Sequence, residues 1–156
     1  MKEIIRNKRI SHNFKILDKW QAGLKLTGSE VKSVKLGQMD LTGSYITLKS
    51  DKNSNIPELY LINAKITSYP KAGYAQNNYN PLRNRKILLN RKEINSLIGK
   101  LKQKGLTLMP FSVYTTSQRL IKLEIALGKG KKKIDKRENI KKRDFERRVK
   151  KKLKAR

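Results

Sequence analysis

Short stretches of alternating apolar and polar positions run through residues 13–128 and indicate β-strands. Phe14 and Ile16 alternate with polar neighbours, and the alternation resumes after a turn at residues 21–23. Pro110 interrupts a later stretch, and because proline cannot donate to a strand ladder, it predicts a bulge or an edge there. The remaining stretches with strand character are residues 45–48, 58–62, 106–114 and 121–127.

Two segments depart from the strand pattern and predict helices. A short helix is expected after Ser29, which is a candidate N-cap. Residues 94–101 carry apolar side chains at the i, i+3, i+4 and i+7 positions of a helix. Asn90 is the expected N-cap of this second helix, Glu93 occupies the capping-box position, and Gly105 supplies the C-terminal stop.

The order of these elements predicts a mainly β fold with helices. No long helix joins consecutive strands, as the crossovers of a parallel α/β sheet would require. We therefore expect an OB-like β-barrel of about six strands at residues 13–128, with the capped helix after a tyrosine-rich loop. A basic N-terminal arm at residues 1–12 is expected to precede the barrel, and a basic tail at residues 129–156 to follow it.

The tyrosine-rich loop spans residues 68–86 and has no apolar period. It carries Tyr69, Tyr74 and Tyr79 among lysine and arginine residues. A loop of this length without structure of its own is either functional or disordered. Aromatic rings interleaved with cations suit stacking on unpaired bases. The alternative is that one or more of these tyrosines packs on the barrel, and the sequence leaves both interpretations open.

The net charge of the chain predicts the class of its partner. The chain has 39 Lys and Arg residues against 12 Asp and Glu residues, a formal net charge of +27. Such a surplus favours phosphate polyanions through counterion release. The tail carries much of this positive charge, with 16 Lys and Arg residues against 4 Asp and Glu residues after residue 128. Because like charges repel along a helix, we expect the free tail to be disordered and to fold as a helix on a polyanion.

The same composition disfavours several classes of protein. The chain lacks cysteine, and His12 alone cannot build a zinc site, so we expect no metal and no cofactor. The sequence places no carboxylate to orient Ser29, Ser33 or His12 as a nucleophile and base, so we do not expect an enzyme. No apolar run is long enough to span a bilayer. The expectation is a cytoplasmic, monomeric protein that does not contact a membrane.

Six motifs in unbroken order carry a resemblance to a known family. They are Asn-Lys-Arg at 7–9 with His12, Ala-Gly at 22–23, Gly-Ser-Glu-Val-Lys-Ser at 28–33, Pro-Leu-Arg-Asn-Arg-Lys-Ile-Leu-Leu at 81–89, Gly-Leu-Thr-Leu at 105–108, and Gly-Lys-Lys-Lys-Ile-Asp-Lys-Arg at 130–137. In these motifs the sequence resembles the SsrA-binding protein family of bacterial trans-translation, over about residues 6–145.

The resemblance implies a function and a set of partners. Members of this family are OB-like barrels that bind the tRNA-like domain of transfer-messenger RNA (tmRNA). With elongation factor Tu, they deliver it to ribosomes stalled on messages without a stop codon, for rescue and peptide tagging. Their C-terminal tail enters the empty mRNA channel near the decoding site of the small subunit and folds there as a helix. The implied partners of this chain are therefore tmRNA, the ribosome and elongation factor Tu.

The resemblance also implies site residues, position by position. Gln21 stands where family members usually have glutamate, and Ile134 replaces a common aromatic residue or histidine. The residues expected to contact RNA are Asn7, Lys8, Arg9, His12, Gln21, Leu88, Asn90, Lys122, Lys129, Gly130, Lys131 and Lys132. The residues expected to act in the ribosome-binding tail are Ile134, Asp135, Lys136, Arg137, Lys141, Arg143 and Phe145.

One alternative belongs to a different functional class. A ribosomal or initiation-factor-like structural protein with a basic extension would share the composition and the fold. Stoichiometric presence on all ribosomes would favour that alternative, whereas enrichment with a single RNA would favour the tmRNA hypothesis.

Overall fold

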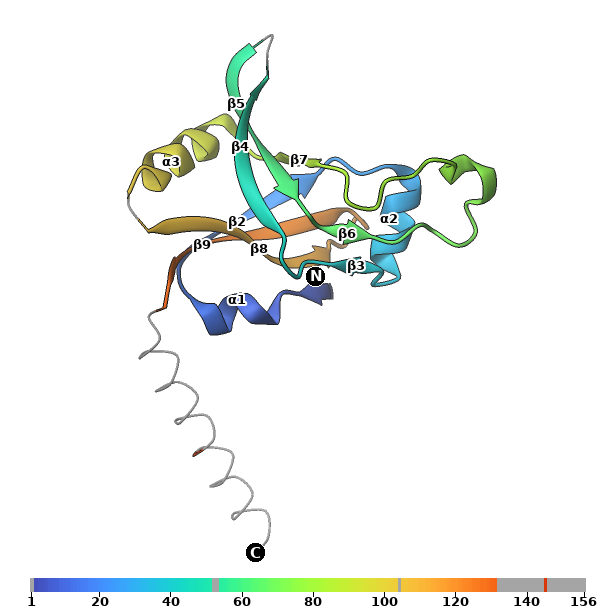
Figure 1. Cartoon of the computed structure of the whole chain (residues 1–156), viewed down its shortest axis with the longest axis horizontal. Coiled ribbons are helices and arrows are strands. Elements are labelled where there is room, and N and C mark those ends of the chain that lie inside the picture. Colours follow the sequence, from blue (N-terminus) through green and yellow to red (C-terminus); the bar gives the residue numbers. More distant parts are fainter. Residues whose placement is uncertain (1, 52–53, 104, 132–144, 146–156) are drawn as a thin grey trace, which may run out of the picture.

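The computed structural model describes residues 2–51, 54–103, 105–131 and 145, which form a mainly β fold with three α-helices (Figure 1). The strands are β1 (Lys2–Arg6), β2 (Phe14–Leu24), β3 (Met39–Asp40), β4 (Tyr45–Asp51), β5 (Ser54–Ile62), β6 (Lys65–Ile66), β7 (Arg85–Leu88), β8 (Leu106–Thr115) and β9 (Ile121–Gly130). The helices are α1 (Lys8–Asn13), α2 (Gly28–Lys35) and α3 (Arg91–Leu101), and a 3-10 turn spans Gly73–Gln76.

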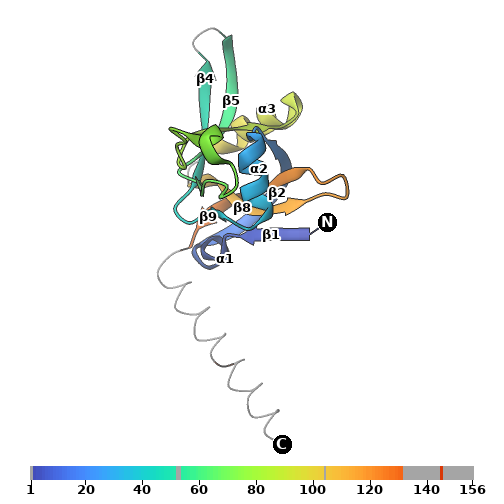
Figure 2. The same cartoon turned by 90° about the vertical axis from the view of Figure 1, so that its right-hand side faces the viewer.

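Seven of these strands form one antiparallel sheet in the order β1-β8-β9-β2-β7-β5-β4, and β3 pairs separately with β6. Strand β9 has a long pairing on each side, with β8 and with β2. The sequence predicts a bulge or an edge at Pro110, and a register shift between Pro110 and Ser112 shows that it is a bulge. The β4–β5 hairpin projects from the body at the end opposite α1 (Figures 1 and 2).

The expected β-barrel is wrong for the described residues, because the sheet is not closed. Its two edge strands are β1 and β4, which are not paired with each other. Strand β4 does contact β8, as the far strand of a curled sheet would. However, within the described residues β4 has no hydrogen-bonded pairing with β8, whose edges pair with β9 on one side and, at Ser112–Thr115, with β1 on the other. The mainly β class is confirmed, but the architecture is an open, curled sheet.

The N-terminal segment supplies the strand that occupies this edge. The sequence predicts an arm at residues 1–12, whereas Lys2–Arg6 pairs with β8 and helix α1 follows directly. Ile4 and Ile5 both pack against the main core. A bulge between Glu3 and Ile5 allows consecutive isoleucines to do so, and for the same reason no period-two pattern marks this strand.

The main core lies between the inner face of the sheet and helices α2 and α3. Strand β9 contributes Leu123, Ile125 and Leu127, Val34 comes from α2, and Leu97 comes from α3. All five side chains are at most 1% exposed. Burying each of them stabilises the fold by roughly 1.5–3 kcal/mol relative to exposure.

A second, smaller core lies on the opposite face of the sheet, beneath α1. Ile10 of α1 packs there against Met109 and Phe111 of β8 and Ala126 of β9. A helix of 6 residues is marginal in isolation, so this tertiary contact is what holds α1 in place. Helix α1 is thereby fixed against the outer face of the sheet, where its exposed side chains face solvent.

Both longer helices begin with a capping interaction. The N-cap of α2 is Thr27 rather than the predicted Ser29. The Thr27 hydroxyl accepts a hydrogen bond from the Glu30 N–H (3.3 Å), and the Glu30 carboxylate accepts one from the Thr27 N–H (2.9 Å). The predicted N-cap of α3 is confirmed at Asn90, whose N–H donates to the Glu93 carboxylate (3.1 Å).

Candidate nucleic-acid interface

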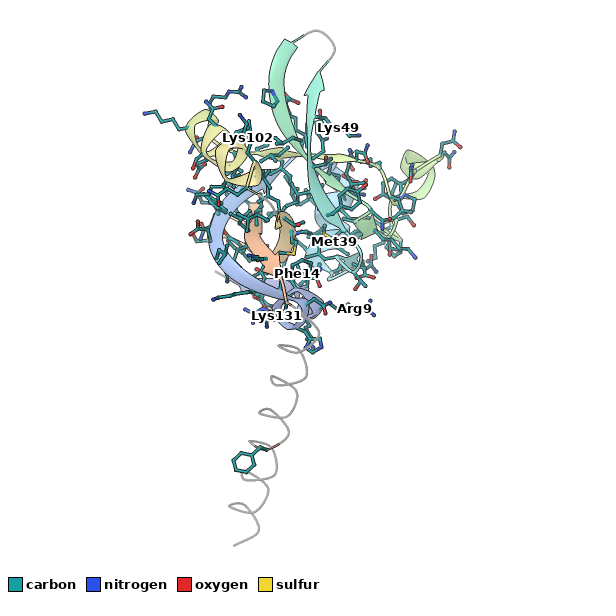
Figure 3. All side chains as sticks on the ribbon, turned by 60° about the vertical axis from the view of Figure 1, so that its left-hand side comes forward. Arg9, Phe14, Met39, Lys49, Lys102 and Lys131 are labelled. Carbon is teal, nitrogen blue, oxygen red and sulfur yellow. The ribbon has the colours of Figure 1, made fainter. Side chains whose placement is uncertain are left out.

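The first group of predicted RNA-contacting residues gathers around α1. We call this group the α1 cluster: Lys8, Arg9, His12, Lys129, Gly130 and Lys131. Strands β2 and β9 pair from Phe14↔Gly130 inward, which places the end of β9 beside the end of α1. Figure 3 shows Arg9, Phe14 and Lys131 together at this end of the molecule. Residues more than a hundred positions apart in the sequence thus form one cationic surface.

Most side chains of the α1 cluster are available to a ligand. Lys8 and Arg9 are exposed on α1, Lys129 is exposed at the end of β9, and His12 is half-buried. The Lys131 N–H donates to the Asn13 carbonyl (2.9 Å) and its Nζ donates to the Ser11 carbonyl (3.0 Å). Lys131 therefore extends the strand pairing by one step and ties the start of the tail to α1.

Asn7 has a structural position beneath this surface. It is only 8% exposed, its Nδ2 donates to the Leu41 carbonyl (2.8 Å), and its N–H donates to the Phe111 carbonyl (2.9 Å). These bonds join the junction of β1 and α1 to two distant segments. The structure thus shows Asn7 orienting α1, so the exposed cations of the helix are the better candidates for direct contact with RNA.

Gly128 lets the sheet pack closely below α1. A Cβ atom built at this position would lie 2.8 Å from Met109 Cε and 3.0 Å from the Lys15 carbonyl oxygen. Contacts this short leave no room for a side chain. Glycine at this position therefore allows β2 and β8 to approach β9 on the face that carries the α1 cluster.

The second group of predicted residues borders a shallow groove on the sheet. We call it the Leu88 groove: Gly23, Leu24, Leu26, Val31, Leu88, Arg119, Leu120, Ile121 and Lys122. Gly23 pairs with Leu88 on one side and with Lys122 on the other, so the two predicted residues flank a glycine. Leu88 and Leu120 are 49% and 53% exposed, which is unusual for leucine. An apolar floor with cations at its rim suits an unpaired base and its phosphate.

Gln21 lies on the same face, two residues before Gly23 on β2. Its cross-strand neighbour is Glu124, whose carboxylate accepts from the Ser112 hydroxyl (2.9 Å) and pairs with Lys19 Nζ (3.3 Å). Gln21 therefore stands beside a carboxylate that already has partners. Asn90 follows Leu88 by two positions in the sequence and is exposed at the start of α3.

The α1 cluster and the Leu88 groove lie at opposite ends of the β2–β9 pair. Lys15 pairs with Lys129 at one end, and Gly23 pairs with Lys122 at the other. Eight residues of strand separate Lys15 from Gly23, or roughly 25 Å at 3.3 Å per residue. The structure thus divides the predicted RNA-contacting residues into two patches.

Predicted residues outside the described part of the chain are Lys132, Ile134, Asp135, Lys136, Arg137, Lys141 and Arg143. Phe145 is described and is 68% exposed.

The sequence did not reveal the buried ionic cluster behind the groove. The sequence places Arg85 among the cations of the tyrosine-rich loop, yet its side chain is fully buried. Its Nε donates to Glu30 Oε1 (2.9 Å). Its two terminal nitrogens donate to the carbonyls of Ala64 (2.6 Å), Arg83 (3.1 Å) and Pro81 (3.0 Å) and to the Tyr79 hydroxyl (3.2 Å). All five guanidinium N–H groups therefore have acceptors, and the loop is folded around Arg85.

Glu30 is the acidic centre of this cluster and is also fully buried. It accepts from Arg83 Nε (2.8 Å) in addition to Arg85 and the Thr27 N–H. Burial alone would raise the pKa of Glu30. The hydrogen bonds from Arg83 and Thr27 and the charge of Arg85 outweigh burial and lower this pKa from 4.5 to about 2. The carboxylate is thus ionised at neutral pH and holds two sequence motifs, 28–33 and 81–89, together.

The tyrosines of the loop are placed in different ways. The Tyr79 hydroxyl donates to the Ile66 carbonyl (3.0 Å) and accepts from Arg85, so this ring packs into the fold. Tyr69 is half-buried, and Lys32 Nζ lies 5.4 Å from its ring centroid. The side chain of Tyr74 is outside the described residues. The packing alternative is therefore confirmed for Tyr79.

Within residues 2–51, 54–103, 105–131 and 145, no group of three or more His, Cys, Asp or Glu side chains could hold a metal ion. No helix in the same part of the chain is long and apolar enough to cross a membrane.

Comparisons with known proteins find similarity over nearly the whole chain. The profile of the SmpB protein family matches residues 4–155. The SsrA-binding protein of Thermosipho melanesiensis is 41% identical over 155 residues, covering 99% of this chain and 100% of that protein. The SsrA-binding protein of Nostoc sp. is 43% identical over 146 residues, covering 94% and 89%. A solved structure described as "tmRNA-SmpB: a journey to the center of the bacterial ribosome" contains a similar chain. That chain has a TM-score of 0.64 and 40% identity, with coverage of 83% of this chain and 85% of that one.

Proposed function

The chain belongs to the SmpB protein family, and we propose that it binds tmRNA and brings it to stalled ribosomes for trans-translation. The observation that carries the proposal is the match of nearly the whole chain to this family. Membership of the family makes the chain a non-enzymatic RNA-binding protein. The partners are tmRNA and the ribosome, and we extend the proposal to elongation factor Tu, a cytoplasmic location and a monomeric state.

The two patches support a division of the RNA-binding work. The Leu88 groove combines exposed apolar side chains with Lys122 and Arg119, which suits an unstacked, unpaired base. The α1 cluster presents the exposed cations Lys8, Arg9 and Lys129, which suits phosphate contacts. A ligand that touched both patches would span roughly 25 Å of sheet, a length that a folded RNA readily covers.

The tail is proposed to read the state of the ribosome. Lys131 leaves the sheet beside α1 and is bonded to it, so the tail begins at a defined point on the body. We assign residues 129–156 to the mRNA channel near the decoding site, with Ile134, Asp135, Lys136, Arg137, Lys141, Arg143 and Phe145 as the contacting residues. The body, residues 13–128 with the N-terminal segment 1–12, would meanwhile hold the tRNA-like domain of tmRNA.

Two measurements test the proposal. Sequencing of the RNA that copurifies with the full chain should show tmRNA as the enriched species, whereas a stoichiometric set of ribosomal RNAs would favour a structural ribosomal protein. Truncation after Lys131 keeps the described contacts of the body, so we expect most of the tmRNA affinity to remain while peptide tagging on stalled ribosomes stops. Normal tagging by the truncated chain would refute the assignment of the tail.

A further inference from the structure

A second groove, not among the predicted RNA-contacting residues, lies beyond the Leu88 groove on the same sheet. We call it the Tyr60 groove: Lys25, Leu26, Thr27, Tyr60, Arg83, Asn84 and Lys86. Its polar lining comes from three segments, namely the link between β2 and α2, strand β5, and residues 83–86 at and before the start of β7. We propose that the Tyr60 groove binds one unpaired nucleotide of an RNA, with the base against the Tyr60 ring and the phosphate near Lys25. This inference rests on the proposed function above.

Strand register makes this groove continuous with the Leu88 groove. Gly23 pairs with Leu88 and Tyr60 pairs with Lys86. Leu88 and Lys86 are two residues apart on β7, so their side chains leave the same face of the sheet. The Lys25 N–H donates to the Lys86 carbonyl (2.9 Å), which holds Lys25 beside this row. An RNA strand that leaves the Leu88 groove along β7 would therefore reach Tyr60 next.

The Tyr60 ring is held in position from within its own strand. Its hydroxyl donates to Glu58 Oε2 (3.0 Å), and the same carboxylate pairs with Lys86 Nζ. Lys49 Nζ of the neighbouring strand β4, labelled in Figure 3, lies 5.9 Å from the ring centroid. A half-buried ring that is fixed in this way can accept a base without first losing much side-chain entropy. Stacking on such a ring does not depend on the identity of the base.

The charge around the groove favours a polyanion. Five cations lie in or next to it, and two carboxylates face them. The cations are Lys25, Lys49, Arg83, Arg85 and Lys86, and the carboxylates are Glu30 and Glu58. Glu30 pairs with Arg83 and Arg85, and Glu58 pairs with Lys86. Lys25 is exposed at the rim and is the cation best placed for a phosphate.

The lining distinguishes a nucleotide from an acidic peptide. An acidic peptide would use the cations but would gain little from the ring. A nucleotide uses both, and the exposed amide of Asn84 adds a donor and an acceptor to the lining of the groove. The continuity with the Leu88 groove points to the same RNA strand. RNA is therefore the occupant that the observations favour.

Three substitutions in the full chain test the groove by anisotropy with a labelled transcript of the tmRNA tRNA-like domain. Tyr60→Leu removes the ring, and we expect binding to weaken by about 5- to 150-fold. Tyr60→Phe keeps the ring, and we expect affinity close to that of the unsubstituted chain. Lys25→Gln should lower the slope of log K against log salt by about 0.7–0.9. Lys102→Gln, at an exposed position at the end of α3, is the matched control and should leave affinity nearly unchanged.

The outcomes separate this inference from the proposed function. If the unsubstituted chain does not bind the transcript, the proposed function fails. If it binds and both Tyr60→Leu and Lys25→Gln bind equally well, only the Tyr60 groove is refuted. If Tyr60→Leu fails to fold, a photoreactive benzoylphenylalanine in place of Tyr60 tests the groove by crosslinking. A crosslink in cells that ribonuclease removes supports the proposal, and a crosslink only to protein overturns it.

Discussion

Glu30→Gln is the substitution that most directly tests how this fold is held together. The change keeps the shape of the side chain but replaces one carboxylate oxygen with an NH2 group. Arg83, Arg85 and the Thr27 N–H all donate to this carboxylate, so an NH2 group in either orientation faces donors. Arg85 would then be a fully buried cation without its counterion.

The magnitude follows from two independent arguments. The pKa of Glu30 falls from 4.5 to about 2 on folding, and at 1.36 kcal/mol per pKa unit this corresponds to about 3 kcal/mol. Removing one partner of a buried ion pair in other proteins costs about 3–5 kcal/mol. We therefore expect the free energy of unfolding to drop by about 3–4 kcal/mol and the thermal midpoint to drop by about 10 °C.

Urea unfolding of the full chain, followed by circular dichroism at neutral pH, measures this difference. The matched control is Asp18→Asn, which breaks the exposed pair of Asp18 with Lys100 and should cost at most about 1 kcal/mol. If Glu30→Gln costs no more than Asp18→Asn, the buried cluster does not stabilise the fold and the reasoning is refuted.

The same cluster predicts a pH dependence. Because the folded state lowers the pKa of Glu30, the stabilisation is complete above pH 4.5 and is lost as the pH falls towards about 2. The difference in unfolding free energy between the unsubstituted chain and Glu30→Gln should therefore be constant from pH 7 to about pH 5 and shrink below pH 4.5. A difference that grows on acidification would contradict the ionised state of this carboxylate.

Three smaller predictions follow from other contacts. Thr27→Ala should destabilise the chain by about 1 kcal/mol, and Ser29→Ala by much less, because Thr27 is the N-cap of α2; equal unfolding midpoints would contradict this. Gly128→Ala should cost about 1–3 kcal/mol in urea unfolding, since its Cβ would lie 3.0 Å from the backbone carbonyl oxygen of Lys15; an unchanged unfolding midpoint would contradict this. Lys8→Gln should leave the unfolding midpoint unchanged and lower the salt slope of tmRNA binding by about 0.7–0.9, because Lys8 is exposed; an unchanged slope would remove it from the interface.

The local elements were predictable where their signals are local. The helix after Asn90 and the bulge at Pro110 were both predicted, since a capping box and a missing N–H act within a few residues. The prediction of Ser29 as an N-cap was wrong, since Thr27 is the N-cap. Both residues have a suitable hydroxyl, and the deciding contact is the Glu30 carboxylate, which three donors hold in place.

The open sheet and the two patches were beyond local reasoning. Strand β1 carries no alternating pattern because a bulge turns two consecutive isoleucines inward, so the strand that fills the edge of β8 was missed. The division of the predicted RNA-contacting residues depends on which residues of β2 and β9 are opposite each other. Pairing register between distant segments is a tertiary property that neither segment shows alone.

The sequence by itself determined the chemistry of this protein: its charge, its lack of cysteine, its strand-rich pattern and the motifs that place it in the SmpB protein family. Only the tertiary structure decided what Arg83 and Arg85 do. Both stand in a basic, loop-like stretch, yet Arg85 is buried on Glu30 while Arg83 keeps a third of its surface exposed at the Tyr60 groove. The physical reason is that a charged side chain is buried only where acceptors from several distant segments converge on it, and that convergence exists only in the folded chain.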